Sequence, residues 1–551
     1  MNSRFTIKPL AIAIGATAAL GATLAQGNSF FVDGAVANAM GGAGIANSDA
    51  INYHSNPALL INNQDDKFAL TLPSVGFFIE DSNGFGDSVM NFVDNDIDQY
   101  TNFDASGIDT AVSTLNTSIT TLGTATDTYN TTPNRTNLDA LIAANADVTT
   151  NVGDVRSETA VIDNLVQSTK STFTSFSGKP MQTGLMANLG LAVPNLGIPF
   201  AVQFANNTFM GFQFELDQTD LTPLDQTLAD SDEYLLLVED VSAKNDIALG
   251  YISDLDTLQT EYDALPAGQA KNDKFDEITA KNTQLQGALT DVNTATNTLQ
   301  NTTTANGVFA GGTFIGAPAF DENNLNSAVH FSAVNVTELG LASAYALNLG
   351  GEDFVAGLKL KFQQIEAISD SYLFKDLAAD AQAQIDGTLN AGRKSHTVFN
   401  ADLGVTKDFA TDSFGTITAA AVVKDLIPYS LDTPAGDKIS IKPQLRVGVA
   451  HHTDWSTLVA DLDVTRNSAM GFGGKTQYLN LGAEVSLKGH AQARIGLKNN
   501  LAVSGDRAVT LGLGLTPFGV GVDISGWFTP GDTDLEMIKN AGVVTQFTMR
   551  F

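Results

Sequence analysis

Apolar and polar residues alternate along many segments of this chain, most clearly near its C-terminal end. In 541–551, Phe547 and Phe551 fall on an apolar face, and Gln546 and Arg550 fall on the opposite, polar face. A period of two predicts a β-strand whose two faces meet different environments. In a membrane barrel one such face lies in lipid, with an aromatic residue at the interface. We therefore predict that 541–551 closes a barrel, with Phe547 and Phe551 as its C-terminal signal; the edge strand of a soluble sandwich is the alternative.

The same alternation predicts fourteen strands in all. In 475–488, for example, Leu481 and Leu487 share one face, whereas Asn480 and Glu484 share the other. The predicted strands are 67–79, 183–193, 199–216, 330–348, 353–369, 395–409, 414–426, 438–451, 455–466, 475–488, 490–502, 507–516, 518–529 and 541–551. A soluble sandwich also alternates, but rarely over successive strands of about ten residues or more. The predicted fold class is therefore an all-β, fourteen-stranded antiparallel outer-membrane β-barrel.

The lengths of the predicted connections agree with such a barrel. Connections after even-numbered strands are short, such as 348–352 and 488–490, and those after odd-numbered strands are mostly longer. Short turns at one end and long loops at the other are typical of outer-membrane barrels, whose short turns face the periplasm. Because the number of strands is even, both ends of the barrel domain lie on that short-turn side.

Two of the long connections contain apolar residues at helical spacing. In 105–170 the spacing is that of a heptad repeat interrupted at Pro133, and in 232–303 the same repeat is interrupted at 266–268. A heptad pattern with one break predicts an α-helical hairpin in each insertion. Disorder is the alternative, because Thr and Asn are mediocre helix formers. Strand parity places both insertions on the outside of the cell.

The N-terminal 66 residues differ in composition from the predicted barrel. Residues 1–25 have a basic start, an apolar stretch of about 15 residues and small residues near the end, which is the pattern of a signal peptide. Residues 26–66 are rich in glycine and fairly apolar, and 67–551 carry the barrel with its insertions. Two motifs in 26–66 are singled out: Gly41, Gly42 and Gly44, and then Asn56, Pro57 and Ala58. Taken alone, these residues predict a compact, irregular segment.

Composition and charge narrow the function classes. The chain has 551 residues, no cysteine and a formal net charge of −32. A chain that has a predicted signal peptide and no cysteine fits a bacterial envelope protein without a disulfide scaffold. The absence of cysteine also excludes thiol chemistry. The acidic balance argues against a nucleic-acid partner, since phosphate binding needs clustered Lys and Arg. Beyond the signal peptide no apolar stretch approaches the roughly 20 residues of a transmembrane helix.

No motif for catalysis, a cofactor or a metal ion holds up. The segment 469–476 resembles a phosphate-binding loop, but a strand-like pattern follows where a helix is required. The acidic segment 94–98 starts like a calcium loop, yet the Gly and Glu that such a loop needs further on are missing. Weak calcium binding there stays open, as does a metal pair at His451 and His452, for which a solvated turn is the simpler interpretation. We expect no enzyme, no cofactor and no metal site.

The turn at 488–490 fixes a register between two predicted strands. A three-residue hairpin loop with Gly489 at positive φ places Glu484 directly opposite Arg494, with both side chains in the lumen. Opposite charges at this spacing stabilise by roughly 0.2–1 kcal/mol, so we predict a structural ion pair. Other lumen-facing charges are also expected, which argues against a wide apolar channel. The predicted set is Lys442, Arg446, Asp461, Asp463, Glu484, Arg494 and Lys498.

The glycine-rich motif and the Asn-Pro-Ala segment resemble those of the FadL-like long-chain fatty-acid transporter superfamily. More closely, six stretches are similar to the family called conjugal transfer protein TraF. They are 68–75, 442–450, 461–465, 477–484, 494–501 and 512–519. The resemblance implies that 26–66 forms a hatch inside the fourteen-stranded barrel. It also implies a structural or contact role in the envelope, associated with conjugation.

The relation to the fatty-acid transporters implies an alternative function, the passage of small hydrophobic molecules across the outer membrane. The partners expected on these grounds are outer-membrane lipid, the barrel assembly machinery through the C-terminal strand, and, under the alternative, a hydrophobic small molecule. The expected location is the bacterial outer membrane, with both insertions facing outside. Fold alone does not decide between the two functions.

Overall fold

The computed structural model contains two compact units, a barrel unit and a helical unit. The described residues are 34–61, 68–81, 106–195, 197–311, 313–316, 325–373, 376, 392–411, 415–436, 438–468, 475–487, 490–504, 506–530 and 540–551. The predicted signal peptide 1–25, the acidic segment 94–98 and most of the glycine-rich loop 469–476 lie outside these ranges.

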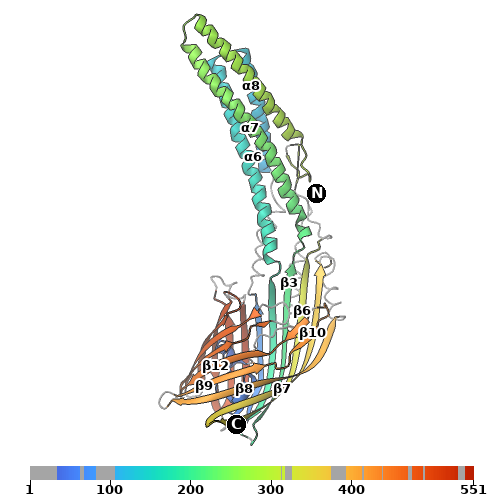
Figure 1. The fold of residues 1–551 in the computed structure, drawn as a ribbon, viewed down its shortest axis with the longest axis vertical. Helices are drawn as coiled ribbons and strands as arrows, with labels where there is room; N and C mark the ends of the chain where they lie inside the picture. The colour runs from blue at the N-terminus through green and yellow to red at the C-terminus, as the bar shows by residue number, and fades with distance from the viewer. Residues whose placement is uncertain are drawn as a thin grey trace. The chain divides into compact units, whose positions relative to one another are not determined.

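Fourteen antiparallel strands form a closed barrel, as the alternation predicts (Figure 1). In order around the barrel they are β1 (Ala69–Glu80), β2 (Pro180–Val193), β3 (Phe200–Glu215), β6 (Ala328–Leu349), β7 (Glu352–Leu373), β8 (Arg393–Thr411), β9 (Gly415–Lys424), β12 (Gln444–His452), β13 (Ser456–Asp463), β16 (Tyr478–Leu487), β17 (Ala491–Asn500), β18 (Arg507–Leu515), β19 (Val520–Phe528) and β20 (Asn540–Arg550). Strand β20 pairs with β1 from Arg550 to Asn540, which closes the sheet and removes its edges.

One predicted strand, 438–451, is wrong in part. The structure divides it into β11 (Lys438–Ile441) and the barrel strand β12, with Pro443 between them. Proline has no backbone N–H to donate to a ladder and is poorly tolerated inside a central strand. Strand β11 instead pairs with β10 (Tyr429–Asp432) in a separate hairpin. Lys442 is exposed in the connection between β11 and β12, and therefore lies outside the barrel strand on which it was predicted.

Two further short hairpins lie outside the barrel sheet. Strand β14 (Asn467–Ser468) pairs with β15 (Lys475–Thr476), and β4 (Phe309–Ala310) pairs with β5 (Thr313–Phe314). The predicted strand 475–488 therefore includes β15 as well as β16. These hairpins belong to the connections and not to the barrel wall.

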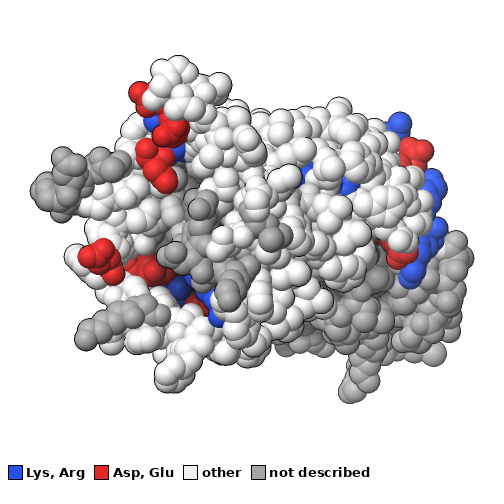
Figure 2. Space-filling model, turned by 90° about the horizontal axis from the view of Figure 1, so that it is seen from below, with Lys and Arg blue, Asp and Glu red and all other residues white. Residues whose placement is uncertain are grey.

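The two faces of the barrel wall differ in polarity. On the outer face Leu481, Val485 and Leu513 are 42%, 54% and 68% exposed. On the inner face the neighbouring Asn480 and Thr510 are almost fully buried. Seen from below, the charged side chains among the described residues gather in a few clusters (Figure 2). An apolar outer wall of this extent is favourable in lipid and unfavourable in water.

The helical unit consists mainly of two helical hairpins. Its helices are α5 (Ser106–Thr131), α6 (Arg135–Phe176), α7 (Thr222–Ala264) and α8 (Gln269–Asn301). The breaks fall at Pro133 and at 266–268, as predicted, although α6 extends past 170 and α7 starts before 232. Helices α6, α7 and α8 run alongside one another in Figure 1. Within the described residues, no helix has both the length and the hydropathy needed to cross a bilayer.

Polar contacts join the two hairpins into one unit. Asn145 on α6 donates to Asn245 on α7 at 2.9 Å, and Asn245 donates to Thr149 at 3.1 Å. Threonine is tolerated inside these helices because its hydroxyl can donate to a carbonyl one turn earlier. The Thr126 hydroxyl, which is buried, donates in this way to the Leu122 carbonyl oxygen at 2.8 Å. The sequence predicted each hairpin but not the contacts between them.

Candidate functional site

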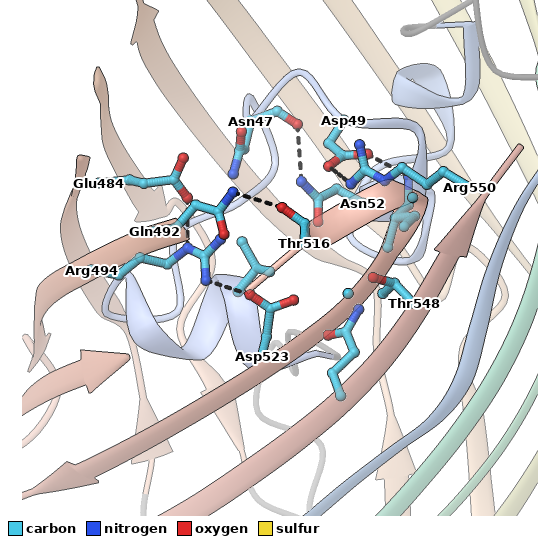
Figure 3. A pocket seen from close by; sticks show the side chains of 15 residues that line it. Asn47, Asp49, Asn52, Glu484, Gln492, Arg494, Thr516, Asp523, Thr548 and Arg550 are labelled. Atoms are coloured by element: carbon cyan, nitrogen blue, oxygen red, sulfur yellow. Dashed lines mark hydrogen bonds and ion pairs between the residues drawn. The ribbon is translucent and has the colours of Figure 1, made fainter. Parts of the chain in front are cut away.

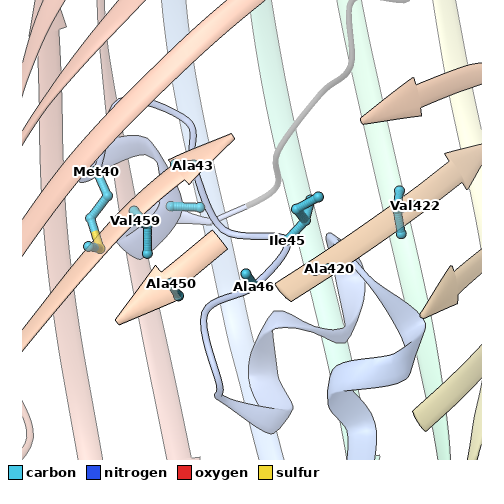
Figure 4. Close-up of a cluster of buried hydrophobic side chains, with 9 residues drawn as sticks. Met40, Ala43, Ile45, Ala46, Ala420, Val422, Ala450 and Val459 are labelled. Carbon is cyan, nitrogen blue, oxygen red and sulfur yellow. The ribbon is translucent and has the colours of Figure 1, made fainter. Parts of the chain in front are cut away.

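The segment 34–61, here called the hatch, lies inside the barrel. It consists of α2 (Ala35–Ala39) and two short 3₁₀ helices, η1 (Ala50–His54) and η2 (Pro57–Ile61). Its apolar side chains pack against the inner wall (Figure 4). The cluster comprises Ala37, Met40, Ala43, Ile45 and Ala46 from the hatch, with Ala420, Val422, Ala450 and Val459 from the wall. Burial against the wall therefore holds this short, irregular segment in place.

The glycine motif of the hatch fits closely against the wall strands β16, β17 and β18. Gly41 and Gly42 have φ of 75° and 82°, a conformation that favours glycine. A Cβ on Gly41 would lie 2.6 Å from the Leu497 carbonyl oxygen and 2.7 Å from that of Leu481. The Gly41 N–H donates to the Thr510 hydroxyl at 2.9 Å. Gly41 thus meets both a conformational and a spatial requirement at the wall.

Buried charges on β12 and β13 hold the hatch backbone. Asp461 accepts the N–H groups of Gly44 and Ile45 at 2.8 Å and 3.2 Å. Arg446 donates to the Gly42 carbonyl oxygen at 3.1 Å and pairs with Asp463 at 2.6 Å. The lumen was the predicted position of these three charged residues, and the structure places them there. Their contact with the hatch backbone was not predicted.

The Asn-Pro-Ala motif forms a tight turn at the opposite side of the hatch. The Asn56 side chain, which is fully buried, donates to the Ile45 carbonyl oxygen at 2.9 Å and accepts the Ala58 N–H at 3.0 Å. Two wall glycines make room for it. A Cβ on Gly404 would lie 1.9 Å from Asn56 Oδ1, and a Cβ on Gly357 would lie 2.2 Å from the Ala58 nitrogen. Asn56 therefore both shapes the turn and links the two halves of the hatch.

Three more wall glycines accommodate the end of α2, and the sequence analysis missed them. A Cβ on Gly482, Gly496 or Gly512 would lie within 2.5 Å of Met40, Gly41 or Ala39, respectively. Gly482 and Gly496 also pair directly across β16 and β17. The signal available in the sequence was the position of these glycines on the lumen-facing side of alternating strands, where a close backbone contact is one reason for glycine.

A polar cavity of about 340 Å³ lies between the hatch and strands β16 to β20 (Figure 3). Arg494 extends along its wall, donating to Glu484 and to Asp523, each at 2.6 Å. Asp49 of the hatch forms an ion pair with Arg550 of β20 on the other side. The predicted pairing of Glu484 with Arg494 is present in the structure, and Asp523 is a third member that the sequence analysis did not identify.

His54 is a buried titratable residue of the hatch. It packs against β2, where a Cβ on Gly190 would lie 2.8 Å from the His54 Cε1 atom. Burial, together with the nearby positive charge of Lys359, lowers the pKa of His54 from 6.5 to about 3. The neighbouring Tyr53 hydroxyl donates to the Val202 carbonyl oxygen at 2.9 Å. While the hatch is packed in the lumen, the His54 imidazole is therefore uncharged at pH 7.

The lumen is more apolar toward the end of the barrel that carries the long connections. Phe78 lies between Phe209 and Trp527, with ring centroids 5.8 Å and 6.4 Å away. Met186 and Val544 complete this group against Ala35 of the hatch. A separate apolar cluster lies at the hairpin of β10 and β11, where Ile439 and Ile441 are buried against inner-wall residues of β6, β7 and β8. This apolar surface within the barrel was not predicted.

The remaining predicted residues lie on or near the wall. Phe547 and Phe551 are half exposed on the outer face, and the Phe551 ring lies 4.9 Å from that of Phe68. His451 and His452 end β12, and His452 lies close to the Ala46 carbonyl oxygen of the hatch, at 3.4 Å. Among the described residues, no group of three or more His, Asp or Glu side chains is arranged to hold a metal ion.

A closed fourteen-stranded antiparallel barrel with an N-terminal hatch in its lumen defines a plugged barrel of the outer-membrane type. The chain belongs to the family described as "F plasmid transfer operon, TraF, protein", whose family model matches residues 53–463. This match confirms the resemblance to the TraF family seen in the sequence.

Solved structures with a similar fold are remote in sequence. The toluene transporter TodX of P. putida is 10% identical, with 94% of this chain and 98% of that chain covered and a TM-score of 0.39. The monoaromatic hydrocarbon channel CymD is 9% identical, with 94% and 97% covered and a TM-score of 0.36. Outer membrane phospholipase A from Escherichia coli is 12% identical, with 39% and 79% covered and a TM-score of 0.23. No curated protein is significantly similar in sequence.

Proposed function

We propose that this protein is a plugged outer-membrane barrel with a structural or contact role in the envelope, associated with conjugative transfer. In this proposal the barrel is the anchor and the helical unit makes contacts outside the cell. The observation that carries it is the attachment of the hatch on several sides of the lumen. Asp461 and Arg446 hold one half, and Gly357 and Gly404 accommodate the other. A barrel closed in this way suits an anchor better than an open pore.

The topology supports an external helical unit. The two insertions lie in the connections from β1 to β2 and from β3 to β6, which are at the same end of an antiparallel barrel. The short turns, such as the one between β6 and β7, lie at the opposite end. Since outer-membrane barrels keep their short turns in the periplasm, the insertions would face outside. As the outward-facing aromatic residues of the C-terminal strand, Phe547 and Phe551 are the residues through which the assembly machinery would recognise β20.

The contact role is tested by removing the helical unit. We would replace 106–176 and 222–301 with short Gly-Ser turns and measure mating efficiency in cells that carry the variant. Correct assembly is checked by the shift in gel mobility that folded barrels show on heating. We expect an assembled barrel and reduced mating. Unchanged mating with an assembled barrel would contradict the contact role, and protection of both insertions from protease on intact cells would contradict the topology.

Passage of small hydrophobic molecules is the second candidate, and the group of Phe78, Phe209 and Trp527 favours it. These aromatic side chains line the lumen on the insertion side of the hatch, where an apolar molecule entering from that side would meet them. Growth of a deletion strain on hydrophobic carbon sources, measured beside its mating efficiency, separates the two candidates. A growth defect with normal mating would favour passage over the contact role.

A further inference from the structure

The cavity between the hatch and strands β16 to β20 differs from the aromatic group in chemistry. Eleven of its fifteen lining residues carry amide, hydroxyl or charged side chains. They include Asp49, Asn52, Glu484, Arg494, Asp523 and Arg550. An apolar molecule would displace water from these groups without replacing its hydrogen bonds, which is unfavourable. The cavity therefore suits water and small polar solutes (Figure 3).

The wall side of this cavity is firmly held. Arg494 donates to carboxylates on both neighbouring strands, Glu484 on β16 and Asp523 on β19, and its side chain is only 6% exposed. Charged hydrogen bonds in such a buried site are short and strong. Because all three partners belong to the wall, movement of the hatch would leave this network intact.

The hatch side is held by a more accessible contact. Asp49 pairs with Arg550 on β20, and the two side chains are 27% and 33% exposed. Asp49 also accepts the Ile51 N–H at 3.1 Å at the start of η1, so the ion pair attaches the first turn of η1 to the wall. Partly exposed ion pairs are weak and sensitive to salt. The buried bonds of Asp461 hold a different part of the hatch, at Gly44.

We propose that this cavity is a vestibule for small, uncharged polar solutes, and that the ion pair between Asp49 and Arg550 is the latch that closes it. Opening the latch frees the start of η1, next to Asn52 of the lining, and widens the cavity there, while Tyr53 at the far end of η1 stays bonded to the wall. The passage this creates is polar, and it is separate from the two functions proposed above.

The test is the swelling of liposomes that contain the purified full-length protein, with arabinose, glucose and sucrose as the solutes. Asp49→Asn removes the ion pair with little change in side-chain shape, and Arg550→Gln removes it from the wall side. We expect several-fold faster swelling with arabinose than for the wild type, a smaller effect with glucose and the smallest with sucrose. The exchanged pair Asp49→Arg with Arg550→Asp should return the rate toward that of the wild type.

Lys407→Gln is the matched control. It removes an ion pair with Glu352, 2.6 Å long, that joins barrel elements and does not involve the hatch. Every variant is first shown to be folded by its heat-dependent gel mobility, and Asp49→Asn keeps the test valid if Arg550→Gln impairs the assembly of β20. The proposal is overturned if folded Asp49→Asn swells no faster than the wild type with arabinose, or if Lys407→Gln accelerates swelling equally.

Discussion

Glu484 and Arg494 lie directly opposite each other on β16 and β17, and the Arg494 Nε atom donates to Glu484 at 2.6 Å. The register of the turn between the strands is enough to bring them together. The structure adds Asp523, which accepts from the other end of the same guanidinium at 2.6 Å. One buried cation therefore balances two carboxylates, and the three residues do not contribute equally to stability.

Arg494→Met should destabilise the barrel far more than Glu484→Gln. Removing the arginine leaves the buried carboxylate of Asp523 and the partly buried one of Glu484 without this partner, for which we expect a loss of about 3–5 kcal/mol. Removing one carboxylate leaves the arginine paired with Asp523, for which a loss of about 1 kcal/mol is expected. The measurement is the temperature at which each variant loses its folded gel mobility. Equal effects of the two substitutions would contradict this division of roles.

Gly404→Ala should disturb the Asn-Pro-Ala turn. The added Cβ would lie 1.9 Å from Asn56 Oδ1, so either the wall or the hatch has to shift. Overpacking of this kind typically costs about 1–3 kcal/mol. We expect faster hydrogen exchange in 43–60. Gly526→Ala is the control, because the nearest atom to its Cβ would be the Gly542 carbonyl oxygen at 3.5 Å; similar exchange in both variants would argue against a glycine-dependent fit.

Acid should loosen the hatch through His54. The pKa of His54 is about 3 while the hatch is packed in the lumen and 6.5 when unperturbed. The imidazole therefore binds a proton more readily once the hatch has left the wall. The stability that the neutral imidazole provides is fully present above pH 6.5 and is lost as the pH falls from 6.5 toward 3. Below 6.5 the loss approaches about 1.4 kcal/mol per pH unit.

Three charged side chains act on His54 from the surrounding wall. Lys359 and Lys424 oppose its protonation, and Glu338 favours it. Hydrogen exchange of 50–61 at pH 7.5 and pH 5.5, expressed as protection relative to the intrinsic exchange rate at each pH, measures the effect. His54→Asn should remove most of the pH dependence from this segment. An equally large dependence in His54→Asn would assign it to other groups.

Asp230 should be the main polar anchor at one end of the helical unit. Its buried carboxylate accepts the Thr304 hydroxyl at 2.6 Å and the N–H groups of Asn306 and Val308 at 3.0 Å and 2.9 Å. Burial by itself raises the pKa of Asp230, but the hydrogen bonds donated by Thr304, Val308 and Asn306 outweigh it, and the pKa is lowered. Its stabilising effect is therefore present above the unfolded pKa of about 3.9 and is lost as the pH falls through the lower folded value.

Asp230→Ala leaves buried donors without an acceptor, and we expect it to destabilise the helical unit by about 3 kcal/mol. Urea unfolding of the full-length protein in detergent, followed by helical circular dichroism, measures this loss. Asp232→Ala is the control, since Asp232 is exposed on the same helix. If both substitutions have the same small effect, the bonds to Asp230 do not stabilise the unit.

The barrel could be predicted from the sequence because lipid and lumen impose opposite requirements on adjacent residues. Leu481 and Asn480 differ for this reason, and the difference repeats along every strand. The error at 438–451 arose because the alternation continues in phase across Pro443. Ile439 and Ile441 are apolar because they face the inner wall from a hairpin, and not because they face lipid. Pro443 was the signal in the sequence that the strand is interrupted, and its effect on the backbone overrides the alternation of apolar and polar residues.

The contacts of the hatch could not be predicted in the same way. Asp461 and Gly44 are 417 residues apart in sequence, and nothing in either local pattern indicates the other. The glycine and Asn-Pro-Ala motifs drew attention to the right segment, but only the fold shows that Gly404 and Gly357 receive it. Local periodicity reports the environment of a residue, whereas these contacts depend on the register of several strands at once.

The bond from the Ala35 N–H to Gln546 joins residues 511 positions apart, and β20 also provides Arg550 for Asp49. The place where the hatch sits is therefore incomplete until β20 has paired with β1. We infer an order of assembly in which the wall closes first and the hatch docks afterwards. A substitution that disrupts β20 would then also disturb the packing of the hatch, 34–61.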